Sequence, residues 1–335
     1  MRLKINFYMI LTLISTCILS CSTNYSTMQT GNWETLTCIN TITGRHENGF
    51  VECNGKFYLF GGRGIKPVEV FDPETFTWEQ LQPTPFEMHH FQAVTIGDTI
   101  YVVGCMTGGY PTEPPVPNIY FYIPKTDTWI KGPEIPESRQ RGSTGAVVYD
   151  GKIYLIAGIQ LGHTTGTVAW FDMYDLKTGE WTKLADAPHI RDHFHAIVVE
   201  DKLYCVGGRN TSYHTENNFT AFFETPVTKV DCYDFTTQTW TSLKNDLPIG
   251  TAAGGIANYN KTILYFGGES GQEQAHSETQ CLDLETGTWS FAAPLNRGRH
   301  GSASIKYQNK LYIAAGSGNR GGGPELTSIE MYTPD

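Results

Sequence analysis

Hydrophobic and polar residues alternate along most of the chain in short runs, which predicts β-strands rather than helices. Residues 191–240 show the repeating unit. An alternating run over 194–199 leads through a two-residue acidic turn to a second run over 202–206, which ends in a double glycine. A third run over 229–233 and a fourth that opens at Trp240 complete the unit. The pattern indicates one four-stranded antiparallel sheet about every 50 residues.

The same unit recurs along the chain. The second-strand glycines return as Gly61-Gly62 and Gly267-Gly268, and turns such as Y-D-L-K-T-G-E-W precede the fourth strands. A double glycine, a Tyr-Asp pair and a tryptophan at this spacing resemble the kelch family, whose repeats form the blades of β-propellers. The resemblance covers nearly all of the chain after residue 30. The tryptophans that open the fourth strands are Trp33, Trp78, Trp129, Trp181, Trp240 and Trp289.

The two ends of the chain predict how the propeller closes. The last repeat begins near His300 and stops before its tryptophan, whereas residues 30–36 contain a T-G-x-W segment with no repeat before it. We therefore expect the strand around Trp33 to complete the last blade. The predicted fold is an all-β, six-bladed kelch β-propeller over residues 31–335, with the N-terminal strand closing the last blade.

The first thirty residues are expected to direct export. An apolar run over 5–19, too short for a comfortable membrane span, follows two basic residues and ends in I-L-S-C. This resembles the lipobox of bacterial lipoproteins. The resemblance implies a signal peptide over 1–20, palmitate or a related acyl chain on Cys21, and a tether over 21–30. It also implies a lipid anchor in a bacterial cell envelope, on the outer membrane or facing the periplasm. An ordinary secretory signal with a chance cysteine remains the alternative.

Composition narrows the function classes. The formal net charge is −10, the opposite sign from that of a nucleic-acid-binding protein, so no nucleic-acid partner is expected. Hydrophobic residues make up 40% and aromatic residues 13% of the chain, enough for a large core in one domain. We expect a monomer.

One face of the propeller is expected to carry the chemistry. Second-to-third-strand connections and the connections between blades emerge on the same face, and long loops on a rigid scaffold often bind ligands. Arginines and histidines fall in or beside these loops, while most lysines lie near the opposite turns. The long connections are 105–118, 159–170, 209–228, 269–279 and 317–327.

Two readings of these cations stay open. Arginine suits bidentate recognition of a carboxylate, which favours an anionic sugar or glycan as ligand. Alternatively, arginines at equivalent blade starts, such as Arg191 and Arg299, tie the blades together. The predicted ligand-binding residues are Arg191, His193, His195, Arg209, Arg297, Arg299, His300 and Arg320.

A metal site is the less favoured interpretation of the histidines. His193 and His195 alternate along one strand, and His90 occupies the position equivalent to His193 in the second blade. Three imidazoles near the central axis are one possibility, but hydrogen bonds to loop backbone and water explain them as well. No metal and no cofactor are expected.

Glu269 is the predicted catalytic residue. It directly follows Gly268 at a strand end. This placement is similar to that in bacterial sialic acid mutarotases, and the resemblance implies that Glu269 transfers a proton. It also implies that Arg297, Arg299 or Arg320 holds the sugar carboxylate. The chain departs from the family in having no arginine after Glu269 within that loop.

The sequence thus favours an envelope-anchored propeller that binds an anionic carbohydrate, with or without sugar mutarotase or epimerase activity. The first alternative is a protein–protein interaction scaffold that uses the same loops. A remote alternative is a copper enzyme similar to galactose oxidase, which needs seven blades, extra domains and a Tyr–Cys crosslink. The chain is too short for that arrangement. Cys205 and Cys232 lie on neighbouring strands, and buried free thiols are expected rather than a disulfide.

Overall fold

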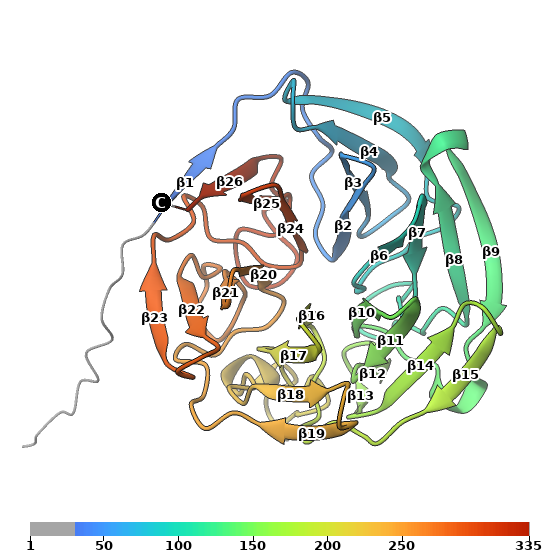
Figure 1. The fold of residues 1–335 in the computed structure, drawn as a ribbon, viewed down its shortest axis with the longest axis vertical. Helices are drawn as coiled ribbons and strands as arrows, with labels where there is room; N and C mark the ends of the chain where they lie inside the picture. The colour runs from blue at the N-terminus through green and yellow to red at the C-terminus, as the bar shows by residue number, and fades with distance from the viewer. Residues whose placement is uncertain (1–30, 335) are drawn as a thin grey trace, which may run out of the picture.

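Six four-stranded antiparallel sheets surround a central axis in the computed structural model, which describes residues 31–334 (Figure 1). The predicted six-bladed propeller is confirmed. Predictions for residues 1–30, including the signal peptide, the tether and lipidation at Cys21, lie outside the described residues. Within residues 31–334, no helix has the length and apolar content needed to span a bilayer.

Each blade contains four consecutive strands, except that the last blade takes its outer strand from the N-terminus. Blade 1 contains β2 (Asn48–Cys53), β3 (Lys56–Gly61), β4 (Pro67–Asp72) and β5 (Thr77–Pro83). Blade 2 contains β6 (Val94–Ile96), β7 (Thr99–Val102), β8 (Asn118–Ile123) and β9 (Thr128–Glu134). Blade 3 contains β10 (Gly145–Tyr149), β11 (Lys152–Ile156), β14 (Phe171–Asp175) and β15 (Glu180–Lys183).

Blade 4 contains β16 (His195–Val199), β17 (Lys202–Val206), β18 (Asp231–Asp234) and β19 (Thr239–Ser242). Blade 5 contains β20 (Gly255–Tyr259), β21 (Thr262–Phe266), β22 (Thr279–Asp283) and β23 (Trp289–Ala292). Blade 6 contains β24 (Ser304–Tyr307), β25 (Lys310–Ala314), β26 (Ile329–Thr333) and β1 (Asn32–Thr35). The loops carry a small hairpin and short 3-10 helices: β12 (Ile159–Leu161), β13 (Thr165–Thr167), η1 (Pro124–Thr126), η2 (Glu137–Arg139) and η3 (Ala221–Glu224).

The N-terminal strand closes the ring as predicted. β1 pairs antiparallel with β26, and Trp33 lies opposite Tyr332. The Trp33 side chain is buried, stacks edge-on against Phe266 and donates a 3.1 Å hydrogen bond from Nε1 to Thr279 Oγ1. Because both of these partners belong to blade 5, the first strand fastens blade 6 to its neighbour.

Backbone hydrogen bonds join the blades around the axis. Just before its first strand, each blade places one residue with positive φ, between 51° and 68°. The amide of each such residue in blades 2 to 6 donates to the carbonyl of the equivalent residue in the preceding blade, at 2.6–3.2 Å. Asn48 N–H closes the circle by donating to Gly301 O at 3.2 Å. We call these six residues the axial ring: Glu47, His90, Ser143, His193, Ala253 and Gly301.

Four buried arginines two residues before the axial ring form ion pairs inside their own blades. Arg191 Nη2 lies 2.7 Å from Asp231 Oδ2, and Arg299 Nη2 lies 2.5 Å from Glu330 Oε1. Their other donors reach backbone carbonyls of the same blade, such as Gly207 and Ala315. These arginines therefore have a structural role, as the second hypothesis from the sequence had it. Their ion pairs, however, stabilise a single blade and do not join two blades. The four pairs are Arg45–Glu69, Arg141–Asp172, Arg191–Asp231 and Arg299–Glu330.

Hydrophobic clusters fill the spaces between neighbouring blades. In the cluster between blades 6 and 1, Phe57 packs edge-on against Tyr312, with ring centroids 4.9 Å apart. Cys205 and Cys232 are buried free thiols, as predicted. The register places Cys205 opposite Asp231 and Cys232 opposite Tyr204, so the two sulfurs do not face each other across the strands.

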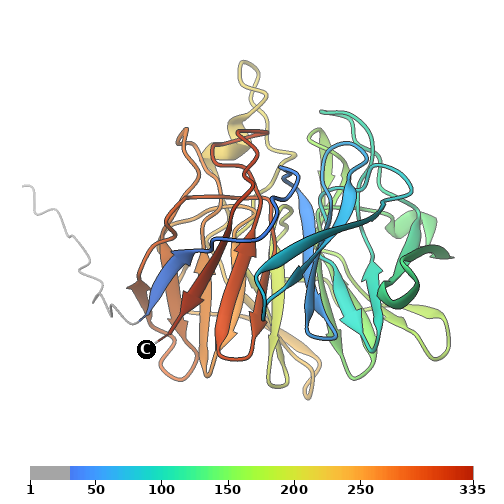
Figure 2. The same cartoon turned by 90° about the horizontal axis from the view of Figure 1, so that it is seen from above.

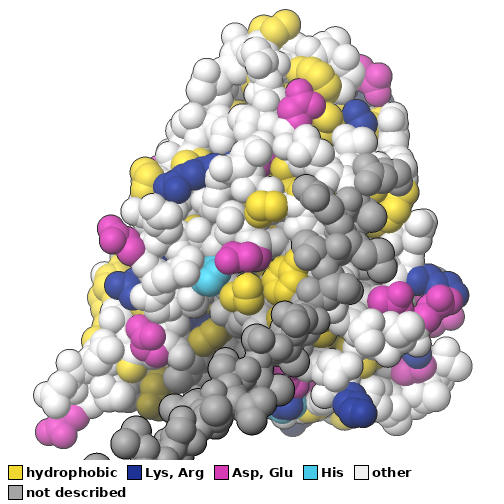
Figure 3. Space-filling model, turned by 90° about the vertical axis from the view of Figure 1, so that its left-hand side faces the viewer, with side chains coloured by type: hydrophobic (Ala, Val, Ile, Leu, Met, Phe, Trp, Pro, Cys, Tyr) yellow, Lys and Arg dark blue, Asp and Glu magenta, His cyan; other side chains and the backbone are white. Residues whose placement is uncertain are grey.

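The two faces of the propeller differ. The long loops rise together on one face, the loop after β17 furthest, and tight turns cover the other face (Figure 2). On the side where β1 and β23 lie, acidic and basic side chains are scattered among hydrophobic ones over the described surface (Figure 3). The long-loop face is therefore the face on which connections from different blades come together.

Replacing the closing tryptophan tests the role of β1. Trp33→Ala removes a buried indole and its hydrogen bond, and we expect it to lower the free energy of unfolding by about 3–5 kcal/mol. Urea denaturation followed by tryptophan fluorescence and circular dichroism measures the loss. Trp181→Ala is the matched control, because Trp181 occupies the equivalent position in blade 3 but is only partly buried. A loss below about 1 kcal/mol for Trp33→Ala would contradict closure by β1.

Candidate functional site

A cavity of about 490 Å³ opens on the long-loop face over the axis. Loops or blade starts of all six blades contribute to its wall. Ionisable groups lie toward the axis, and aromatic rings from two long loops cover the sides. The lining residues are His46, Glu47, Arg63, Glu87, His90, Gly109, Tyr110, His163, Arg209, Phe222, Phe223, Glu269, His300, Gly321 and Gly322.

Glu269 lies in this cavity and is almost completely buried. It pairs with Arg209, accepts a 2.8 Å hydrogen bond from Gly321 N–H, and lies 3.3 Å from His300 Nε2. Burial, the largest single influence, would raise its pKa. His300, Arg209 and the Gly321 amide together outweigh it and lower the pKa of Glu269 to about 2. Glu269 is therefore an ionised carboxylate at neutral pH and can accept a proton.

Arg209 is held on several sides. Its Nε donates a 2.9 Å hydrogen bond to Thr211 Oγ1, and its guanidinium lies 4.7 Å and 4.8 Å from the ring centroids of Phe222 and Phe223. The loop after β17, which carries both phenylalanines, thus packs on Arg209. Its position, and with it that of Glu269, is fixed by these contacts.

A second ion pair forms the opposite wall. Arg63 binds Glu113, and the other oxygen of Glu113 lies 2.8 Å from His163 Nδ1. Burial would raise the pKa of Glu113, but the hydrogen bond from His163 and the charge of Arg63 lower it to about 2. His163 Nε2 lies 3.3 Å from Arg209 Nη2, so the two ion pairs are linked through this imidazole.

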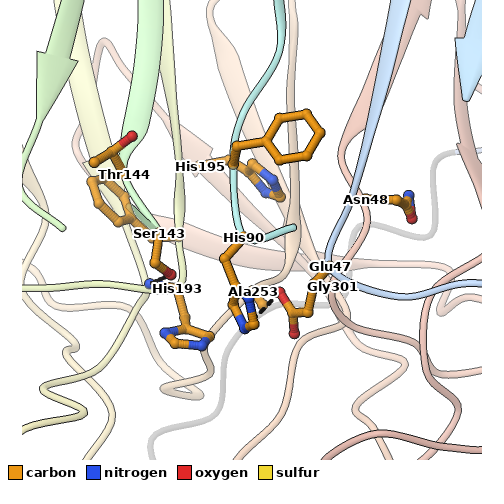
Figure 4. Close-up of a pocket in the computed structure, with 11 residues that line it drawn as sticks. Glu47, Asn48, His90, Ser143, Thr144, His193, His195, Ala253 and Gly301 are labelled. Carbon is orange, nitrogen blue, oxygen red and sulfur yellow. Dashed lines mark hydrogen bonds and ion pairs between the residues drawn. The ribbon is translucent and has the colours of Figure 1, made fainter. Parts of the chain in front are cut away.

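His90 and Glu47 belong to the axial ring and line both the main cavity and a smaller space beside it, which Figure 4 shows. His90 Nε2 lies 3.6 Å from Glu47 Oε2, and His90 Nδ1 lies 2.6 Å from His89 Nδ1. Burial lowers the pKa of His90 well below its ordinary value. This imidazole is therefore neutral at neutral pH.

His193 and His195 lie around a smaller space of about 20 Å³ next to the axial ring. His193 Nδ1 is 2.6 Å from Asp192 Oδ1, whereas His195 Nδ1 is 2.9 Å from Gly254 O. Only His193 points in the same direction as His90. Of the three imidazoles considered from the sequence, His90 and His193 lie together, with ring centroids 4.7 Å apart, and His195 points away from them.

The predicted site residues separate into three groups in the structure. Glu269, Arg209 and His300 line the main cavity, and His193 and His195 line the smaller space. The remaining four do not line the main cavity. Arg191 and Arg299 are held inside their blades, Arg297 Nη2 donates to Asn319 Oδ1, and the exposed Arg320 lies over Phe223 at the rim.

Glu47, Arg63 and His163 are among the cavity-lining residues that the sequence prediction did not include. Glu47 was detectable, because it follows Arg45 at the spacing at which His193 follows Arg191. Arg63 and His163 lie in loops of different length, where the repeats do not align. Their contacts arise between blades and leave no signal at fixed spacing.

A family model that matches most of the chain identifies the family. The chain is 30% identical over 318 residues to the Kelch-like protein terF of Aspergillus terreus, a match covering 85% of this chain and 64% of that protein. A family model described as the Attractin/LZTR1 beta-propeller matches residues 20–274. The chain belongs to the kelch-repeat β-propellers. Human Kelch-like protein 23 is 24% identical over 302 residues, which cover 88% of this chain and 50% of that protein. This kelch propeller thus spans 50–64% of the length of these two relatives.

A solved structure described as "Structure of YjhT" has the same fold. It aligns with a TM-score of 0.73 and 17% identity, covering 87% of this kelch propeller and 95% of that chain. The likeness concerns the arrangement of the blades. The chemistry of the site must be argued from the residues of this chain.

Acid titration tests the state of Glu269. Because its pKa in the folded protein is about 2, below the ordinary 4.5, its ionised form stabilises the fold above pH 4.5, and this contribution is lost as the pH falls toward 2. Between about pH 5 and pH 2, the wild type should lose on the order of 3 kcal/mol more stability than Glu269→Gln. Denaturant unfolding at each pH measures both. Parallel curves for the two proteins would show that Glu269 is not held ionised.

Proposed function

We propose that this protein binds an acidic sugar in the cavity and that Glu269 transfers a proton during interconversion of its anomers. The observation that supports this most is a buried carboxylate, fixed by Arg209 and the Gly321 amide, facing an enclosed cavity. The resemblance of the Glu269 position to sialic acid mutarotases points to the same chemistry.

The cavity wall suits a carbohydrate. Phe222, Phe223 and Tyr110 present aromatic surface, and Glu269, His46 and His300 present polar groups on other sides. A sugar ring has an apolar face of C–H groups and an edge of hydroxyl groups, which match these two kinds of wall. The volume of about 490 Å³ is that of a small-molecule site.

Arg63 is the group proposed to meet the carboxylate of the sugar. Its side chain is 24% exposed, whereas Arg209 is almost fully buried. Arg63 is already paired with Glu113, so an acidic ligand must share its guanidinium. Comparing acidic with neutral sugars therefore tests this part of the proposal separately from proton transfer.

Mutarotation requires only proton movement and one reversible bond cleavage. Glu269 accepts the proton of the anomeric hydroxyl, the bond between the anomeric carbon and the ring oxygen breaks, and the ring oxygen takes a proton. Reclosure on the other face of the new carbonyl gives the second anomer and returns both protons. General base catalysis of this kind contributes typically about 10²–10⁴-fold.

Exchange NMR tests the activity directly. The protein should accelerate exchange between the anomers of an acidic sugar such as a sialic or uronic acid, and Glu269→Gln should reduce this rate by at least about 100-fold. Glu273→Gln is the matched control, because Glu273 is an exposed glutamate of the same loop and should leave the rate unchanged.

Other outcomes of this experiment are also decisive. Line broadening without exchange would overturn the catalytic part and leave a sugar receptor. Equal exchange of acidic and neutral sugars would overturn the role of Arg63. No response to any sugar would overturn the proposal.

A protein partner is the second candidate function. Tyr110, Tyr213 and Phe219 are large side chains of the long loops, and each is more than 40% exposed. Tyr110 and Phe219 lie within 6.3 Å of each other, centroid to centroid. Exposed aromatic residues of this kind are enriched in protein interfaces. The absence of any response to sugars in the exchange experiment would favour this function.

We also propose that the chain is anchored to a bacterial envelope membrane through a lipid on Cys21. The proposal rests on the I-L-S-C segment after a basic and apolar leader. In cells fed labelled palmitate, the wild type should carry label and sediment with membranes, whereas Cys21→Ser should carry none. Cys38→Ser is the control and should keep the label. Equal labelling of wild type and Cys21→Ser would contradict anchoring at this position.

A further inference from the structure

Three imidazoles converge between the main cavity and the axial ring. The ring centroids of His90, His163 and His193 are 4.7 Å, 5.0 Å and 5.4 Å apart in pairs. One nitrogen from each histidine lies within 4.8 Å of the others, and all three residues are buried. Each comes from a different blade connection, so the rigid scaffold brings them together.

Hydrogen bonds orient two of these imidazoles. His163 Nδ1 faces the Glu113 carboxylate at 2.8 Å, and His193 Nδ1 faces the Asp192 carboxylate at 2.6 Å. A carboxylate only accepts, so both Nδ1 atoms carry hydrogen, and in this tautomer each Nε2 offers a lone pair to a metal ion. His193 Nε2 is buried and has no hydrogen-bond partner among residues 31–334.

A longer relay orients the third. His89 Nε2 lies 3.0 Å from the carbonyl oxygen of Gly108, so it donates there, and His89 Nδ1 must accept. His90 Nδ1, 2.6 Å away, therefore carries the hydrogen. This leaves a lone pair on His90 Nε2, which faces Glu47 Oε2 at 3.6 Å. Two acceptors facing each other in a buried site require a cation or a proton between them.

The charged groups around the three imidazoles also favour a bound cation. The buried carboxylates are Glu47, Glu113, Asp192 and Glu269, and the arginines paired with them are Arg63 and Arg209. Among the ion pairs of residues 31–334, Glu47 and Asp192 have only histidine partners, whereas Glu113 and Glu269 each pair with an arginine. A cation held by the imidazoles would add positive charge close to Glu47 and Asp192.

We propose that His90, His163 and His193 bind a divalent transition-metal ion, with zinc as the expected metal. Three imidazole ligands with carboxylates behind two of them are typical of zinc sites that keep a fourth position open. The nitrogens must draw together by about 1 Å to reach Zn–N bonds of about 2.0–2.1 Å. The weak 3.3 Å contact of Arg209 Nη2 with His163 Nε2 is given up on binding.

The fourth position of this site faces the cavity. Glu47 Oε2 lies 3.6 Å from His90 Nε2, close enough to accept a hydrogen bond from a metal-bound water. His90 and His163 also line the main cavity, so an oxygen of a bound ligand can reach the same ion. The metal would then polarise a hydroxyl or carbonyl oxygen of the ligand. The proposal adds a Lewis acid to the site of the proposed function but does not depend on it.

Metal binding is measured on the full chain without sugar. The purified protein should retain one equivalent of Zn²⁺ through dialysis, and Co²⁺ should give the visible absorption of a four- or five-coordinate complex. X-ray absorption of the zinc-loaded wild type should show three imidazole nitrogens at about 2.0–2.1 Å. This last measurement needs no variant and so does not depend on how a variant folds.

Variants identify the ligands. His193→Ala should weaken Zn²⁺ binding by more than about 100-fold. Glu113→Gln leaves the three imidazoles in place but weakens the support of His163, along with the ion pair to Arg63, and should weaken binding by about 10- to 100-fold. His276→Gln is the matched control, because this buried histidine on the same face bonds to Ser270 and Glu278 and lies outside the cluster. Its affinity should equal that of the wild type.

Three results would overturn the proposal. The purified protein fails to retain Zn²⁺, the X-ray absorption spectrum lacks scattering from imidazole rings, or His193→Ala and His276→Gln bind Zn²⁺ with equal affinity. Anomer exchange by protein stripped with a chelator separates the two proposals. Exchange without metal supports the role of Glu269 whatever the zinc result, and zinc binding without exchange leaves the metal site standing alone.

Discussion

The ring of backbone hydrogen bonds around the axis is the constraint on which the site depends. Each blade enters it through one residue with positive φ, a conformation that costs a residue with a side chain about 1 kcal/mol or more. The hydrogen bonds between successive blades hold these residues in place. Three of the six have small or no side chains, and the other three are Glu47, His90 and His193. The ring residues that carry large polar side chains therefore belong to blades 1, 2 and 4.

Buried charges of both signs give the site its second property. Arg209 with Glu269 and Arg63 with Glu113 are ion pairs in a region with little water, linked through His163. Such pairs cost desolvation energy and add little net stability, but breaking one leaves an uncompensated buried charge. They keep the carboxylates ionised and the side chains in one orientation. The site is thus arranged before any ligand enters, which reduces the reorganisation that binding requires.

The sequence repeats made the whole fold predictable, but they made only some residues of the site predictable. The double glycines and tryptophans fixed six blades, and the T-G-x-W segment around Trp33 identified the closing strand. Glu269 was found because it follows a repeated glycine. Arg191 and Arg299 have the same side chain as Arg209, yet carboxylates inside their own blades, Asp231 and Glu330, bind them. Only three-dimensional contacts distinguish these cases, because the partner of each arginine lies 31–60 positions away in the sequence.

The axial ring also bears on how such proteins diversify. Main-chain atoms make the ring, so the identity of its side chains is nearly independent of the fold, as Gly301 and His193 at equivalent places illustrate. Single substitutions at these six positions, one per blade, can therefore change the side chains at the floor of the cavity while the fold is kept, in evolution or in protein engineering. The residue types favoured at these positions are those that tolerate positive φ, such as Gly, Asn, Asp and His.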